Sequence, residues 1–138
     1  MRRINLLLIL VLCTSLLAGC SSSIKASLDN QFTLAPGQSA RIASESMTIK
    51  FIGVTADSRC ATGVECIRAG DVICGVEITK DGILNSVTLT DTAGSGMTEG
   101  YVFQNYTIVF SVSPYPVASK TIAKADYRLT LKVSKSGQ

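Results

Sequence analysis

The 138-residue chain is long enough for one ordinary domain and too short for two. Apolar residues make up 46% of it, and there is no histidine and no tryptophan. The missing histidine removes the commonest general base and the commonest transition-metal ligand, while a formal net charge of +3 gives little support to a nucleic-acid partner.

The first 19 residues have the organisation of an export signal. Residues 1–3 supply a short positive start, and residues 4–18 form an almost uninterrupted apolar run. The run is shorter than the roughly 20 residues that a membrane-spanning helix needs, but it fits the core of a signal peptide. It ends in Leu17-Ala18-Gly19-Cys20, which resembles the lipobox of bacterial lipoproteins.

The resemblance implies that Cys20 receives diacylglycerol and becomes the first residue after cleavage, so that Cys13 is discarded. An ordinary secretory signal cut nearby, or an uncleaved anchor, is the alternative. Ser21 follows the lipidated cysteine and favours outer-membrane delivery over inner-membrane retention in a bacterium with two membranes. Without residues 1–19 the chain has 11 basic and 10 acidic residues, a net charge of about +1, which excludes a nucleic-acid interpretation.

Residues 20–30 are small and polar with no strand or helix period, and we expect them to form a flexible tether between the lipid and the domain. The folded domain is then expected over residues 31–138. Two short strands are predicted around Phe32–Leu34 and Ala40–Ile42, on either side of a Pro36-Gly37 turn. Met47–Val54 is a longer strand whose alternation slips between Phe51 and Ile52, which predicts either a bulge or burial on both faces at that point.

Strict alternation of apolar and polar residues predicts the remaining strands. The clearest inward-facing sets are Val72, Cys74, Val76 and Ile78; Val87 and Leu89; Tyr106, Ile108, Phe110 and Val112; and Tyr127, Leu129, Leu131 and Val133. Asp81-Gly82 predicts a hairpin, and residues 91–100 a polar, Gly-rich loop. The pattern predicts an all-β domain, a seven- to eight-stranded antiparallel β-sandwich that is Ig-like in the broad sense, with a small β-barrel as the alternative.

Three cysteines remain in the domain, and two of them lie in the turn-rich segment 57–70. Cys60 and Cys66 flank Gly63 and are the natural disulfide pair in an exported protein, whereas Cys74 is expected in the core. A bridge from Cys74 to Cys60 or to Cys66 is the alternative. No metal site and no cofactor are expected, because zinc would need a fourth ligand that no histidine can supply.

The charged residues of this segment allow two interpretations. In the first, Asp57 caps backbone N–H groups at the entrance of the loop, and Arg59 pairs with Asp57 or with a neighbouring carboxylate. Alternatively, Arg59, Glu65 and Arg68 form a charged recognition loop.

The same segment resembles a group of small uncharacterised bacterial lipoproteins and secreted proteins of β-sandwich type. Their pattern is F-x-x-V-x-x-D-S-R-C-P-x-x-V-x-C-x-x-x-G, and this chain departs from it at Ala61, where the group has Pro, and at Arg68, where it has Trp. The matching residues are Phe51, Val54, Asp57, Ser58, Arg59, Cys60, Val64, Cys66 and Gly70. The resemblance covers about twenty residues and implies a disulfide-closed loop on an all-β scaffold, with no known activity.

The functional expectation is a membrane-anchored, non-catalytic lipoprotein of the cell envelope. An enzyme would need a nucleophile with a base, a carboxylate pair or a metal, and the sequence assembles none of these. The domain is expected to act as an extracytoplasmic binding or envelope-structural module, with an envelope protein, a glycan or a protease as its partner. The alternative is a proteinase inhibitor that acts through the disulfide-closed loop 57–70.

Overall fold

A computed structural model of the chain describes residues 22–92 and 100–137. The predicted signal segment, the lipobox with Cys20 and Ser21, and most of the predicted loop 91–100 lie outside the described residues. In the described part of the chain no helix is long and apolar enough to cross a membrane.

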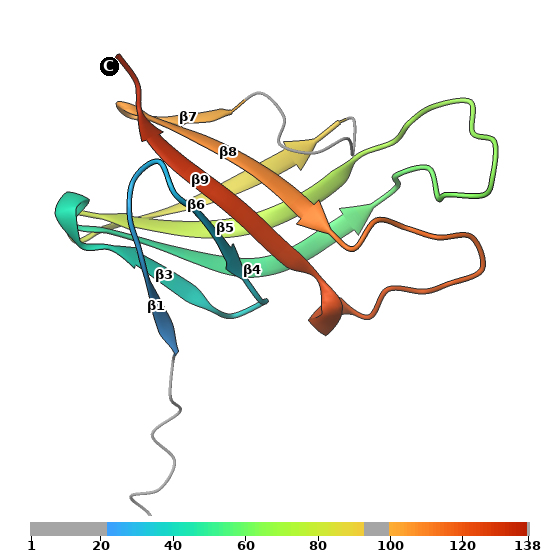
Figure 1. The fold of residues 1–138 in the computed structure, drawn as a ribbon, viewed down its shortest axis with the longest axis horizontal. Helices are drawn as coiled ribbons and strands as arrows, with labels where there is room; N and C mark the ends of the chain where they lie inside the picture. The colour runs from blue at the N-terminus through green and yellow to red at the C-terminus, as the bar shows by residue number, and fades with distance from the viewer. Residues whose placement is uncertain (1–21, 93–99, 138) are drawn as a thin grey trace, which may run out of the picture.

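The described residues hold nine strands, where seven or eight were expected, in two sheets that pack face to face (Figure 1). The five-stranded sheet has the order β1-β3-β4-β5-β6, and the four-stranded sheet has the order β2-β9-β8-β7. The strands are β1 Ser23–Ala26, β2 Gln31–Leu34, β3 Ser39–Ile42, β4 Met47–Asp57, β5 Val72–Lys80, β6 Ile83–Asp91, β7 Tyr101–Phe103, β8 Tyr106–Ser113 and β9 Arg128–Lys135. The sheets do not close on each other, so the predicted β-sandwich is confirmed and the barrel alternative is wrong.

The core lies between the two sheets and consists of the inward-facing residues of the alternating segments. The inward sets predicted on β5, β6, β8 and β9 are all buried, and Tyr127 just before β9 is buried with them. The other fully buried side chains come mainly from β2, β3 and β4, and the largest are Leu34, Ile42, Met47, Ile49 and Phe51. Period-two patterning therefore identified the faces that pack, because each sheet has one dry face.

Local turn chemistry explains how successive strands are joined. Asp81 and Gly82 both have positive φ, 50° and 83°, which is the backbone of a two-residue hairpin, and Lys80 pairs with Ile83 across it. The register of β4 against β5 shifts between Phe51 and Gly53, at the point where the alternation slips. The predicted hairpin and bulge are both confirmed.

The predicted tether is wrong from Ser23 onward. Ser23–Ala26 form the edge strand β1, which pairs in parallel with β3, so the sandwich is not purely antiparallel. Ile24, Ala26 and Leu28 are partly buried and pack against the core. Their period-two spacing was overlooked because the segment is rich in serine. The three-residue strand β7 was also not predicted, and two 3₁₀ turns, Ala43–Glu45 and Lys124–Asp126, are the only helical segments among the described residues.

Candidate functional site

Two long connections extend from the same end of the sandwich and contact each other (Figure 1). The first, residues 58–71, joins β4 to β5, and the second, residues 114–127, joins β8 to β9. Thr62 holds them together: its N–H donates to the Pro116 carbonyl at 3.0 Å, and its own carbonyl accepts from the Ala118 N–H at 3.0 Å. We call these two connections the loop pair.

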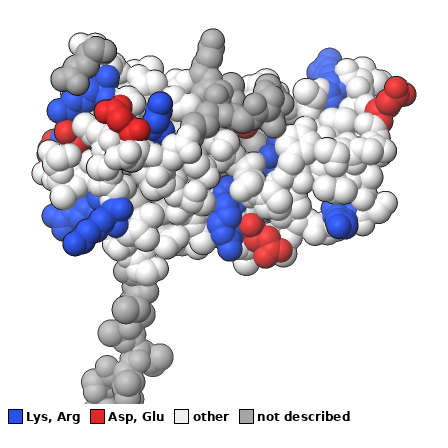
Figure 2. Space-filling view, in the orientation of Figure 1, with Lys and Arg blue, Asp and Glu red and all other residues white. Residues whose placement is uncertain are grey.

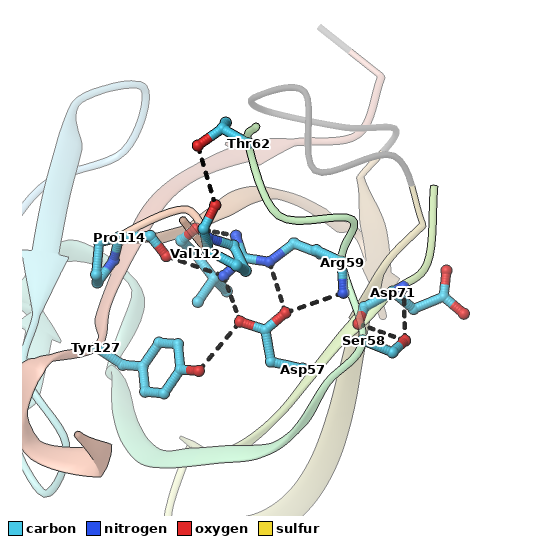
Figure 3. A network of polar contacts seen from close by, with 9 residues as sticks. Asp57, Ser58, Arg59, Thr62, Asp71, Val112, Pro114 and Tyr127 are labelled. Atoms are coloured by element: carbon cyan, nitrogen blue, oxygen red, sulfur yellow. Dashed lines mark hydrogen bonds and ion pairs between the residues drawn. The ribbon is translucent and has the colours of Figure 1, made fainter. Parts of the chain in front are cut away.

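Arg59 and Asp57 tie the base of the loop pair together (Figure 3). The Asp57 carboxylate accepts from Nε of Arg59 at 2.8 Å and from its Nη2 at 2.6 Å, so the pair is bidentate. The same guanidinium donates across the sandwich to the carbonyls of Val112, at 2.7 Å, and Pro114, at 2.9 Å. It also lies 5.0 Å from the centroid of the Tyr115 ring.

The ion pair is shielded from water. The side chain of Arg59 is 1% exposed and that of Asp57 is 8% exposed, and the Tyr127 hydroxyl donates to Asp57 at 3.0 Å. Burial alone would raise the pKa of Asp57, but the hydrogen bonds and charge of Arg59 hold it below the ordinary value of 3.8. Burial and the hydrogen bond to Asp57 raise the pKa of Tyr127. At neutral pH the pair is therefore ionised and the tyrosine is neutral.

The first connection is closed by covalent and backbone contacts. Cys60 and Cys66 form the predicted disulfide, with sulfurs 2.07 Å apart, and Cys74 is the one free cysteine among the described residues and is buried. Below the bridge, Cys60 N–H donates to Ala69 and Ser58 N–H donates to Asp71, both at 2.7 Å. Gly70 has φ +71°, and a Cβ there would lie 1.9 Å from the Ser58 carbonyl oxygen, so this close approach requires glycine.

The tip of the loop pair presents aliphatic side chains to solvent. Ile67 is fully exposed, Val64 is 51% exposed, and Val117 on the second connection is 43% exposed. These side chains sit on a framework held by the disulfide, the two Thr62 hydrogen bonds and the Arg59 network. Exposed apolar residues on a backbone held in this way can bind a protein partner with a small loss of entropy.

The structure separates the three charged residues that were grouped as a recognition loop. Glu65 and Arg68 are exposed, but Arg59 is buried and its guanidinium is fully engaged inside the molecule. The grouping was wrong for Arg59, because the Asp57 carboxylate, the Val112 carbonyl at the end of β8 and the Pro114 carbonyl of the second connection hold its guanidinium. Sequence reasoning missed three members of this site: Tyr115, Val117 and Tyr127. Each contacts a residue of the segment 57–62 that is more than 50 positions away in sequence.

A hollow of about 210 Å³ lies beside the ion pair, lined by Asp57, Pro116, Lys120, Thr121, Ile122 and Tyr127. Asp57 is its one carboxylate, and both oxygens are occupied by Arg59 and Tyr127. Within residues 22–92 and 100–137 no group of three or more metal-ligating side chains comes together.

No protein-family model, curated protein or solved structure matches the chain. The geometry of the loop pair and the sequence that precedes β1 therefore remain as the guides to function.

Proposed function

We propose that the chain is a lipid-anchored, non-catalytic protein of the bacterial cell envelope whose loop pair binds another envelope protein. The lipobox-like Leu17-Ala18-Gly19-Cys20 supports the anchor, with Cys20 carrying the lipid. The observation that carries the binding role is the set of exposed aliphatic residues Val64, Ile67 and Val117, held on two cross-linked connections.

The physical case for the loop pair is that little entropy is lost when it binds. An ordinary long loop must be ordered on association, and each immobilised side chain costs about 0.5–1.5 kcal/mol. Here the backbone is already held by the disulfide and by hydrogen bonds between the connections. Apolar burial of Val64, Ile67 and Val117 therefore contributes directly to affinity. Glu65 and Arg68 lie beside them and would select the partner by charge.

Substitution of the tip tests this role against a matched control. Ile67→Asp in the exported, anchored protein is expected to abolish recovery of the partner in a crosslinking pull-down from the native envelope. Ile83→Asp alters an equally apolar residue, 68% exposed, in the hairpin between β5 and β6, and is expected to leave recovery unchanged. Equal recovery of the partner with both variants would show that the loop pair is not part of the binding surface.

The anchor is tested separately by the mass of the mature protein. A chain that begins at Cys20 and carries diacylglycerol supports the proposal, and an unmodified N-terminus elsewhere rejects it. Cys20→Ser is expected to release the protein from the membrane fraction.

A second candidate function is proteinase inhibition through residues 57–70. The full exposure of Ile67 in a disulfide-closed segment favours it, because a rigid exposed side chain can occupy the specificity pocket of a protease. Inhibition of a protease from the same envelope, lost on Ile67→Asp, would identify the partner as an enzyme.

A further inference from the structure

The described fold leaves very little chain between the proposed lipid and the sandwich. This inference rests on the proposed lipidation of Cys20. Strand β1 begins at Ser23, so only Ser21 and Ser22 separate it from Cys20. Three Cα-to-Cα steps span at most about 11 Å even when fully extended. A domain attached in this way stays against the membrane surface.

Basic side chains lie on the sheet face next to the start of the domain. In β1, β3 and β4 the inward positions hold Ile24, Ala40 and Ile49, so the alternate positions point to the outer face of the sheet. Those outer positions carry the exposed residues Lys25, Arg41 and Lys50. We call this set the basic face. Figure 2 shows Lys and Arg side chains gathered beside the point where the described chain begins.

The basic face carries more positive charge than the protein neutralises. Lys25 and Arg41 are direct cross-strand partners, and like charges in that position repel each other. Lys50 lies 3.8 Å from Glu77, but among the described residues neither Lys25 nor Arg41 has an ion-pair partner. An external anionic surface would relieve this repulsion.

We propose that the basic face rests on anionic phospholipid headgroups of the membrane to which Cys20 is anchored. The short connection holds the face within reach of the headgroups, and the opposite charges orient it. The base of the loop pair, at Asp57, lies seven residues beyond Lys50 along β4, which is about 20 Å away at the usual strand rise. The loop pair therefore stays clear of the anchor point and accessible to its partner.

The test measures which lysines the membrane shields in the acylated, full mature protein. The protein is reconstituted in phosphatidylcholine vesicles, or in vesicles of three parts phosphatidylcholine to one part phosphatidylglycerol. Water-soluble acetylating reagent then modifies exposed lysines, which are quantified by peptide mass spectrometry. Lys25 and Lys50 report on the basic face, and the exposed Lys120 and Lys124 of the loop pair are internal controls.

The expected result is that acetylation of Lys25 and Lys50, relative to Lys120 and Lys124, falls at least about fivefold with anionic lipid. The protection should disappear near 1 M salt, where the Debye length is about 3 Å. Arg41→Gln should lower the protection several-fold. Arg68→Gln removes the same charge from an exposed site in the loop pair and should not change it.

Two outcomes overturn the proposal: equal reaction of all four lysines in anionic vesicles, or equal protection in both kinds of vesicle. The mass of the N-terminal peptide is measured on the same samples. An acylated Cys20 with unprotected Lys25 and Lys50 rejects the basic face while leaving the lipoprotein intact. An unacylated N-terminus rejects the anchor itself.

Discussion

The guanidinium of Arg59 makes four hydrogen bonds, two to Asp57 and one each to the carbonyls of Val112 and Pro114. It is the residue that connects the β4–β5 connection to the end of β8. Its hydrogen bonds to two backbone carbonyls occupy the guanidinium, and its charge is balanced locally by Asp57. Its role is to position the exposed tip of the loop pair without contacting a partner itself.

Removing both members of this ion pair should cost less than the sum of the costs of removing each one alone. Arg59→Ala leaves a carboxylate with an 8% exposed side chain unpaired, and we expect a loss of about 3–5 kcal/mol in the free energy of unfolding. Asp57→Asn should cost less, and the double variant should be more stable than the sum of the two losses predicts. Urea unfolding at neutral pH measures all three. Additive losses would show that the two side chains act independently.

The same ion pair predicts a dependence of stability on pH. Because the pKa of Asp57 is lowered by folding, its stabilisation is complete above the unfolded value of about 4 and is lost as pH falls through the folded value. The wild-type protein should therefore be more stable than Asp57→Asn at neutral pH, and the difference should shrink below about pH 4. Thermal unfolding of both proteins from pH 7 to pH 2.5 measures it. A difference that is constant with pH would mean that Asp57 does not titrate as an ion-pair partner.

At the scale of elements, the sequence is informative wherever one face of a strand is dry. The alternating sets on β5, β8 and β9 predicted both the strands and their buried faces, since period two permits one register against the core. The β4 bulge and the Asp81-Gly82 hairpin followed from equally local signals. Strand β7 has three residues, too few to show a period.

The candidate site was less predictable because its contacts are long-range. The Cys60–Cys66 bridge and the Asp57–Arg59 pair are local and could be inferred from spacing. The acceptors in Val112 and Pro114 are 53 and 55 positions from Arg59, and Thr62 meets Pro116 across a similar separation. No local pattern links these segments, so the burial of Arg59 and the membership of Val117 in the tip could not be read from the sequence.

Strand β1 gives a test of where the folded domain begins. Ile24 packs against the core, so Ile24→Asp should destabilise the protein by about 1–3 kcal/mol and expose β3 amides to hydrogen exchange. Lys25→Asp places the same charge on the outward face and should change stability by less than about 0.5 kcal/mol. Equal effects of the two substitutions would show that residues 23–26 belong to a linker after all.

At the scale of the whole molecule, the placement of charge and the length of the connection act together. Lys25, Arg41 and Lys50 lie on one sheet face next to the proposed anchor, while Val64, Ile67 and Val117 lie at the tip of the loop pair. The two proposed functions, membrane contact and partner binding, then use separate surfaces. The membrane-facing surface depends on the proposed anchor for its local concentration, because three basic residues alone bind an anionic bilayer weakly.

That dependence predicts the effect of lengthening the connection. Inserting twelve Gly and Ser residues between Ser22 and Ser23 extends the path from Cys20 to β1 from three Cα-to-Cα steps to fifteen and leaves β1 intact. The effective concentration of the basic face at the membrane falls roughly as the −3/2 power of the length of the connection, which is about tenfold here. Protection of Lys25 and Lys50 from acetylation should therefore fall markedly in anionic vesicles. Partner recovery through the loop pair should persist, since its tip is unchanged. Unaltered lysine protection in the lengthened protein would mean that the basic face holds the membrane without help from the short connection.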